Sequence, residues 1–173
     1  ENAMKVFVTG ACGQLGHDLL NELSKRNIEC MGSDLAPSYS GVQDGSAATK
    51  APYVSVDITD ADAVMKAVSD YAPDAVIHCA AWTAVDAAED EDKKDTVEAV
   101  NVKGTANIAD ACAKTGAKML YLSTDYVFDG KGETPWDPDC TDYAPLSVYG
   151  KTKLGGELAV REKLTNYFIV RIA

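Results

Sequence analysis

Tyr149 and Lys153 stand four positions apart, a spacing at which two side chains can move a proton together. On a helix such positions share a face, so the phenol and the ammonium would point to the same side. A phenol with an ordinary pKa of about 10 is a poor acid at neutral pH, but a neighbouring cation stabilises the phenolate and lowers that pKa. An exposed tyrosine and lysine on a solvated helix would show the same spacing. Taken with the motifs below, the pair predicts a general acid, with Tyr149 as the proton donor.

A hydroxyl group could hold the substrate against that acid. Ser123, Thr124 and Asp125 follow an apolar run that starts at Lys118, and parallel strands present functional groups at their carboxyl ends. Thr124 is the better candidate, because Ser123 still belongs to the alternation of the strand. A turn satisfied locally by these hydroxyls is the alternative. We expect Thr124 to donate a hydrogen bond to a substrate carbonyl oxygen.

The glycines of GACGQLG, residues 10–16, predict a phosphate-binding turn. A β-branched and aromatic run precedes them, and leucines at helical spacing follow them. Gly10 would allow the tight turn, Gly13 would let the backbone approach a pyrophosphate, and Gly16 would allow close packing of helix and strand. The free N–H groups and the positive end of the helix dipole would then face the anion.

Asp34 strengthens this interpretation, because it ends the next strand-like run, 18 residues after Gly16 and 24 after Gly10. An acid about 20 residues beyond such a turn accepts hydrogen bonds from an adenosine ribose. Three glycines alone could serve only to form a tight turn, without binding a ligand. Together with Asp34 they predict a dinucleotide site.

The elements that would position these groups alternate between strand and helix. The pattern predicts an α/β fold, a doubly wound parallel sheet of six strands in the order 3-2-1-4-5-6 with helices on both faces. Ligands would bind where the first and fourth strands diverge. His78 lies within an apolar run and is expected to be structural, and residues 35–52 are expected to form an exposed loop. The predicted strands are 4–9, 28–33, 53–57, 75–81, 118–123 and 167–172.

Composition limits the classes of function. A chain of 173 residues, 46% of them hydrophobic, can bury one core, and no apolar run approaches the length of a membrane helix. A net charge of −11 argues against nucleic acid as a partner. The five cysteines include no CxxC pair and are expected to be reduced, with no metal site. We expect a cytoplasmic protein, residues 1–3 being a cloning remnant and residues 4–173 one NAD(P)-binding domain.

Four motifs together resemble a known family: GACGQLG, AAWTAVDAAEDE, STDYVFDG and PLSVYGKTKLGGE. In type and order they are similar to motifs of the extended short-chain dehydrogenase/reductases, and within these to the dTDP-4-dehydrorhamnose reductase family. The resemblance runs from Met4 to the end of the chain. It implies a Rossmann fold and the NADH- or NADPH-dependent reduction of dTDP-4-dehydro-6-deoxy-L-mannose to dTDP-L-rhamnose. It also implies that a C-terminal portion, which holds the sugar nucleotide in the family, is absent here.

The resemblance assigns roles residue by residue. The catalytic residues would be Thr124, Tyr149 and Lys153, and the sugar would meet Thr124 and Asp125. The family further implies a homodimer and a magnesium ion, for which no residues of this sequence mark a site. The cofactor contacts it implies are Gly10, Cys12, Gly13, Gln14, Leu15, Gly16, Asp34, Asp57, Ile58, Ala80, Ala81, Trp82, Tyr149 and Lys153.

Two other functions stay open at this point. One is a non-catalytic regulator similar to the regulatory subunit of methionine adenosyltransferase, and the other is a sugar-nucleotide epimerase or dehydratase of the same superfamily. The intact set of Thr124, Tyr149 and Lys153 favours an enzyme over a regulator. The choice between cofactors also stays open, because Asp34 would repel a 2′-phosphate, whereas Lys25 and Arg26 would attract one.

Overall fold

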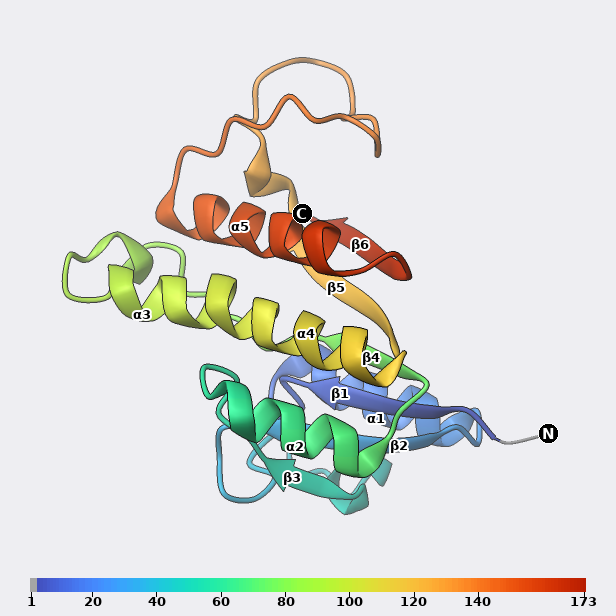
Figure 1. Ribbon diagram of the computed structural model, residues 1–173. Coiled ribbons are helices and arrows are strands. Elements are labelled where there is room, and N and C mark those ends of the chain that lie inside the picture. Colours follow the sequence, from blue (N-terminus) through green and yellow to red (C-terminus); the bar gives the residue numbers. More distant parts are fainter. Residues whose placement is uncertain (1–2) are drawn as a thin grey trace.

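Six parallel strands form the centre of the computed structural model, which describes residues 3–173 (Figure 1). Their order, 3-2-1-4-5-6, confirms the predicted doubly wound sheet. Residues 1–3 are interpreted as a cloning remnant. Glu1 and Asn2 lie outside the described residues, so this interpretation stays a prediction. The strands are β1 (Lys5–Thr9), β2 (Glu29–Asp34), β3 (Tyr53–Ser55), β4 (Ala75–His78), β5 (Lys118–Thr124) and β6 (Tyr167–Ile172).

Helices cover both faces of this sheet, as Figure 1 shows. On one face lie α2 (Ala61–Tyr71), α4 (Thr105–Thr115) and α5 (Val148–Lys163), and on the other lies α1 (Gln14–Lys25). The alternation of β1 explains the two layers, because Phe7 packs toward α2 and α4 while Val6 and Val8 pack toward α1. The shorter elements are η1 (Ala47–Lys50), η2 (Ala87–Glu89), α3 (Lys94–Glu98), η3 (Ala99–Gly104) and η4 (Asp125–Val127).

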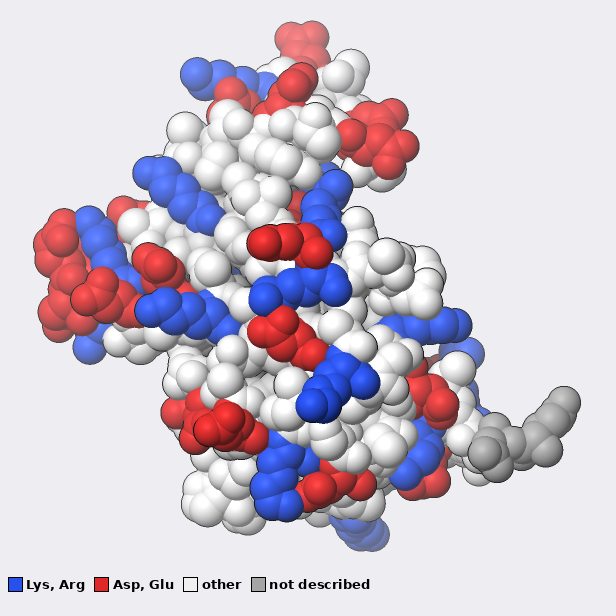
Figure 2. Space-filling view, viewed as in Figure 1, with Lys and Arg blue, Asp and Glu red and all other residues white. Residues whose placement is uncertain are grey.

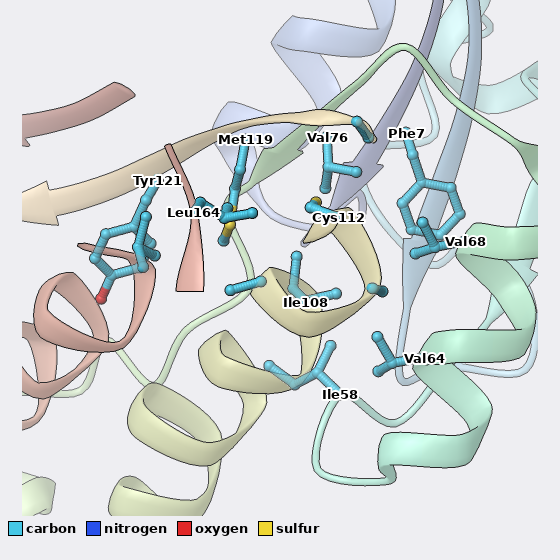
Figure 3. Close-up of a cluster of buried hydrophobic side chains, with 14 of the residues drawn as sticks. Phe7, Ile58, Val64, Val68, Val76, Ile108, Cys112, Met119, Tyr121 and Leu164 are labelled. Atoms are coloured by element: carbon cyan, nitrogen blue, oxygen red, sulfur yellow. The ribbon is translucent and has the colours of Figure 1, made fainter. Parts of the chain in front are cut away.

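The larger core cluster joins the sheet to α2 and α4 (Figure 3). Its strand residues are fully or almost fully buried, and each buried apolar side chain of this size contributes about 1.5–3 kcal/mol. This packing fixes the helices that follow β3 and β4 against the sheet, and so fixes the carboxyl ends of those strands. The cluster includes Phe7, Ile58, Val64, Val68, Val76, Ile108, Cys112, Met119, Tyr121 and Leu164.

Local signals set the helix ends. The Asp60 carboxylate accepts a hydrogen bond from the Ala63 N–H at 3.0 Å and begins α2, and the Ser147 hydroxyl accepts one from the Gly150 N–H at 3.0 Å and begins α5. Gly116 adopts a left-handed conformation, with φ of 77°, and ends α4.

The segment between β2 and β3 differs from the exposed loop that its composition predicts. It contains η1, and Ala48 is 1% exposed. The Tyr39 hydroxyl contacts His17 Nδ1, and His17 Nε2 lies 3.0 Å from an Asp44 oxygen. These contacts fix the segment against α1. The sequence did not predict this packing, because the segment contains only scattered apolar residues and no regular apolar pattern.

One strand and one helical segment also depart from the predicted regular pattern. β4 ends at His78 rather than residue 81, because the N–H groups of Cys79 and Ala80 both bond to the Thr9 hydroxyl at 3.1 Å instead of continuing the ladder. The helical segment that follows β4 is not one uniform α-helix, because it begins as α3, passes through the π-helical segment η3 and continues as α4.

Charges of both signs are interspersed over α2, α4 and α5 on the face shown in Figure 2. Acidic side chains gather at the left of that view, over α3 and the segment before it. In the part of the chain that the structure describes, no helix combines the length and the apolar character needed to cross a membrane.

Candidate functional site

A cleft of about 500 Å³ opens at the carboxyl ends of the strands, where β1 and β4 diverge. This volume falls in the range of about 300–1,000 Å³ that is typical of ligand sites. Residues from the glycine turn, β2, the segment after β4, β5 and α5 line it together. Of the predicted residues, the cleft is lined by Gly10, Gly13, Gln14, Leu15, Gly16, Asp34, Asp57, Ile58, Ala80, Ala81, Trp82, Tyr149 and Lys153.

The glycine turn is built so that two of its glycines admit no side chain. Gly10 has a φ of +70°, and a Cβ there would lie 2.7 Å from the Ala80 backbone nitrogen. A Cβ on Gly16 would lie 2.1 Å from the Gly10 carbonyl oxygen. A Cβ on Gly13 would meet its nearest atom, the Gly10 carbonyl oxygen, at an ordinary 3.4 Å. The lack of a side chain at Gly13 therefore does not relieve a clash but leaves this side of the cleft open.

The amino end of α1 is free to face an anion. Gly13 is its N-cap residue and has no side chain to bond the first N–H groups of the helix. These groups and the positive end of the helix dipole are the features that bind phosphate in doubly wound folds. The turn therefore suits a pyrophosphate.

Asp34 is held in place beside that turn. One carboxylate oxygen accepts a hydrogen bond from the Cys12 N–H at 3.0 Å, and the other accepts one from the Leu35 N–H at 2.8 Å. Each oxygen keeps a further lone pair for a ligand hydroxyl. Cys12 itself does not line the cleft, so its part in the site, as the structure has it, is this backbone bond.

Thr9 and His78 fasten β1 to β4 beneath the cleft. The Thr9 hydroxyl accepts the two N–H bonds from Cys79 and Ala80, so its own proton goes to His78 Nδ1 at 2.7 Å. His78 Nε2 then donates to the Thr105 hydroxyl at 3.1 Å. Burial, and next the charge of Lys153, lower the pKa of His78 to about 3. A neutral, fully bonded imidazole fits the structural role expected for His78.

Lys153 is a buried cation. Its ammonium donates to the Leu122 carbonyl oxygen at 2.6 Å and lies 4.5 Å from the centre of the Tyr121 ring. Burial lowers its pKa to about 8, while Cys79 and Glu157 act in the opposite direction. Among the lining residues, all of which are described, it is the sole lysine or arginine.

Tyr149 lines the same cleft one helical turn before Lys153. Burial raises the pKa of its phenol, and the Thr124 hydroxyl opposes that shift. The expectation that Lys153 lowers this pKa is not met, because the Lys153 ammonium bonds to a backbone carbonyl and burial dominates at the phenol. The Tyr126 ring packs edge-on against Tyr149, with 5.8 Å between ring centres.

Thr124 and Asp125 stand outside the lining of the main cleft. Thr124 is 4% exposed, and its hydroxyl accepts a hydrogen bond from the Tyr126 N–H at 3.2 Å, which begins η4. Asp125 lines a second pocket of about 240 Å³. Ser123 does line the main cleft, although its hydroxyl bonds to Glu157 at 2.6 Å.

Asn101 joins the two sides of the cleft, and the sequence analysis missed it. It sits in the π-helical segment η3, where its Oδ1 accepts from the Trp82 N–H at 2.8 Å. Its Nδ2 donates to the Thr152 hydroxyl at 3.0 Å, next to Lys153. Such π-helical turns occur frequently at functional sites. A polar residue on the apolar side of a predicted helix was the available signal.

Glu89 holds the amino end of α5 and was likewise missed. Its carboxylate accepts a hydrogen bond from the Val148 N–H at 2.7 Å, beside the Ser147 cap. A carboxylate at this place also complements the helix dipole. The turn of α5 that carries Tyr149 is therefore fixed by two separate segments of the chain.

Residues 3–173 hold no group of three or more His, Cys, Asp or Glu side chains that could bind a metal ion. This part of the chain therefore marks no site for the magnesium ion that the family resemblance implies. The further residues that line the main cleft are Thr9, Ser33, Leu35, Val56, Cys79, Thr83, Val100, Leu122, Ser123 and Ile172.

Strand order and the glycine turn at the switch point define a doubly wound domain of the Rossmann class. Within that class the chain belongs to the RmlD substrate binding domain family, whose model matches residues 4–173. The resemblance found in the sequence motifs is thereby confirmed.

Individual relatives share this domain. A dTDP-4-dehydrorhamnose reductase of Streptomyces griseus is 42% identical over 168 residues, which are 96% of this chain and 48% of the relative. The methionine adenosyltransferase 2 subunit beta of Pongo abelii is 34% identical over 97% of this chain and 46% of the relative. A crystal structure of a dTDP-4-dehydrorhamnose reductase from Bacillus anthracis, in complex with NADP, superimposes with a TM-score of 0.82 at 35% identity, covering 99% of this chain and 54% of that one.

The chain thus spans about half the length of the curated relatives it matches. The division into a cofactor-binding part, present here, and a separate substrate-binding portion stays a prediction.

Proposed function

We propose that this protein takes part in the reduction of the 4-keto group of dTDP-4-dehydro-6-deoxy-L-mannose to dTDP-L-rhamnose, with NADH or NADPH as cofactor. The observation that carries the proposal is that a glycine turn, an oriented Asp34, Tyr149 and Lys153 line one cleft. The relatives named as reductases support it, because they match this chain over nearly its whole length.

The residues present fit a dinucleotide. The backbone at Gly10, Gly13 and Gly16 would receive the pyrophosphate against the amino end of α1, and Asp34 would bond the adenosine ribose. Ala80, Ala81 and Trp82 would lie along the cofactor, and Lys153 would reach the nicotinamide ribose. When bound, the nicotinamide supplies a hydride to the carbonyl carbon.

Tyr149 would supply the matching proton. The phenol is protonated at neutral pH and would give this proton to the carbonyl oxygen as negative charge develops there. The Thr124 hydroxyl would bond that oxygen and orient the carbonyl toward Tyr149. The buried Lys153 ammonium would act by holding the nicotinamide ribose beside Tyr149, since it does not lower the pKa of the phenol.

A reductase assay of the full-length protein, including the C-terminal portion expected from the family resemblance, tests this proposal. The oxidation of NADH or NADPH is followed by absorbance with dTDP-4-dehydro-6-deoxy-L-mannose as substrate, and cofactor binding is measured in parallel by calorimetry. We expect consumption of the cofactor with wild type and a large loss with Tyr149→Phe. Binding of cofactor without any reduction would contradict the proposal and favour a regulator like the methionine adenosyltransferase subunit. Cofactor that stays tightly bound through purification and turnover would favour an epimerase.

We further propose a cytoplasmic location and a homodimer, which rest on the family resemblance. Light scattering on a size-exclusion column measures the oligomeric state, and a monomer at micromolar concentration would contradict the dimer. The net charge of −11 supports a small-molecule partner rather than nucleic acid.

A further inference from the structure

Glu157 lies on α5, one helical turn after Lys153, and its side chain is 0% exposed. Arg171 of β6 binds it with two parallel bonds, from Nε and Nη2 to the two carboxylate oxygens, each at 2.9 Å. The Ser123 hydroxyl of β5 donates a third bond, at 2.6 Å. The buried carboxylate is thus paired with a cation and joins α5 to the ends of β5 and β6.

The other side of Arg171 meets the long segment 128–146, which arches above α5 and β6 in Figure 1. Its guanidinium lies 5.1 Å from the centre of the Phe128 ring and 5.5 Å from that of Tyr143. It also donates to the Pro138 carbonyl oxygen and to the Tyr143 hydroxyl, each at 3.4 Å. Phe128 in turn stacks on Trp136 with 4.4 Å between ring centres.

This segment forms one wall of the second pocket, together with η4. Phe128, Trp136 and Leu146 line the pocket beside Asp125 and Tyr126. The Tyr126 ring contacts Tyr149 edge-on, so the pocket adjoins the end of the main cleft that carries the proposed acid. Whatever fixes the segment also fixes this pocket.

A planar guanidinium can bind a carboxylate with one edge while its face stacks on aromatic rings, which a lysine ammonium cannot do. Buried ion pairs contribute little net stability compared with apolar packing, but they can specify a unique geometry. Here the pair connects the elements that carry Thr124 and Lys153 to the wall of the adjoining pocket. An apolar pair would fill the same space without giving the segment this attachment.

We propose that Arg171, held by Glu157, is a positioning residue that fixes segment 128–146 beside the reacting end of the cleft and so sets the affinity for the sugar nucleotide. This role rests on the proposed function. Arg171 does not itself line the main cleft and acts through Phe128, Tyr143 and Pro138.

The first test measures the attachment without any assay of activity. Lys131 is exposed within the segment, so trypsin cleavage after it, followed by mass spectrometry, reports how often the segment opens. We expect cleavage to be about tenfold faster in Arg171→Lys and in Tyr143→Ala. Tyr143→Ala leaves the Glu157, Ser123 and Arg171 bonds in place, so it gives a result even if Arg171→Lys folds poorly.

The matched control is Arg26→Lys, which changes an exposed arginine–glutamate pair at the far end of α1 and should leave the cleavage rate unchanged. Urea unfolding of every variant separates local opening from global instability. Unchanged cleavage after Lys131 in both Arg171→Lys and Tyr143→Ala would overturn the attachment.

The second test uses the full-length protein and measures the consequence for the substrate. In Tyr143→Ala we expect the KM for dTDP-4-dehydro-6-deoxy-L-mannose to rise about tenfold, while kcat changes less and the Kd for NADH stays within about twofold. A KM equal to wild type in a variant that trypsin cleaves faster would refute the positioning role. A wild-type protein that binds NADH without reducing the sugar would remove the proposed function and the substrate role together, whereas the cleavage rates would still decide the attachment.

Discussion

At the scale of single residues, Tyr149 combines a protonated phenol with a place in the cleft. We expect Tyr149→Phe to lower kcat about 10²- to 10⁴-fold, because a positioned acid contributes in the transition state, and to leave the Kd for NADH nearly unchanged. Steady-state kinetics and calorimetry measure the two quantities. The control is Tyr167→Phe, at the remote end of β6. Turnover of Tyr149→Phe close to wild type would exclude Tyr149 as the acid.

Lys153 gives a pH dependence whose sign follows from burial. Its pKa is lowered to about 8, so the free protein loses the ammonium as the pH rises through that value. An anionic cofactor favours the protonated form, so binding takes up a proton above pH 8, and the affinity for NADH falls by as much as about tenfold per pH unit. Calorimetric titration between pH 7 and 9.5 measures this. Lys153→Met should bind more weakly throughout and lack the trend, and an identical trend in that variant would assign it to another group.

His78 gives a pH dependence of stability. Its pKa falls from the usual 6.5 to about 3 on folding, so between these values the unfolded chain binds more protons than the folded one. The contribution of a neutral His78 is therefore complete above pH 6.5 and is lost as the pH falls toward 3. Between pH 7 and pH 5 this loss is about 2 kcal/mol. Urea unfolding at both pH values should show it in wild type and not in His78→Asn, and equal losses in the two proteins would contradict the assignment.

The sequence could predict residues whose role is set by local conformation. Gly10 and Gly16 are needed by the turn that contains them, and Tyr149 and Lys153 share a face because their helix places them so. Asn101 has partners in the segment after β4 and in α5, and no local pattern brings those partners together. Glu157 and Arg171 lie on α5 and β6 and meet through tertiary packing alone.

At the scale of elements, two glycines of the glycine turn have different roles: Gly16 allows tight packing within the turn, and Gly13 leaves room for a ligand. Gly16→Ala would place a methyl 2.1 Å from the Gly10 oxygen, so the turn must shift, and we expect lower stability together with loss of cofactor binding. Gly13→Ala meets its nearest atom at 3.4 Å, so we expect a stability within about 1 kcal/mol of wild type but weaker NADH binding, because the methyl occupies the approach of the pyrophosphate.

Thermal unfolding and calorimetry on this pair of variants measure both effects, each variant serving as the control for the other. Wild-type affinity for NADH in Gly13→Ala would show that the pyrophosphate does not approach at this glycine.

Element order and most element boundaries followed from the sequence, because the apolar periods of 2 and 3.6 residues are local. The exceptions are places where a side chain replaces a backbone partner or where packing is sparse. The Thr9 hydroxyl binds the backbone N–H groups that follow His78, so β4 ends there. His17 binds Asp44 and so fixes residues 35–52 against α1. The π-helical insertion at η3 leaves no mark in the apolar pattern, which runs through it from Val97 to Cys112.

At the scale of the whole molecule, charge bears on the choice of cofactor. The chain carries a net charge of −11, and Lys153 is the sole cation in the described lining of the cleft. Lys25 and Arg26 stand at the carboxyl end of α1, a 12-residue helix about 18 Å long whose other end meets the cleft. Arg26 is also paired with Glu22 there. These two residues therefore do not offset the charge of Asp34.

NADPH adds a 2′-phosphate to the ribose that Asp34 is placed to bind, so both the local carboxylate and the overall field oppose it. We expect NADPH to bind at least about tenfold more weakly than NADH at low salt, since two like charges within a few ångströms cost at least about 1.4 kcal/mol. Raising the ionic strength from 0.01 to 1 M shortens the screening length from about 30 Å to about 3 Å, which removes the field of distant charges but not the contact with Asp34. The ratio of the Kd for NADPH to the Kd for NADH, measured by calorimetry, should therefore fall with salt yet stay above one.

The variant Asp34→Asn should lower this ratio at every salt concentration, whereas Asp62→Asn, the same charge change on the exposed side of α2, should not. Equal or tighter binding of NADPH by wild type at low salt would show that a donor elsewhere in the protein receives the 2′-phosphate.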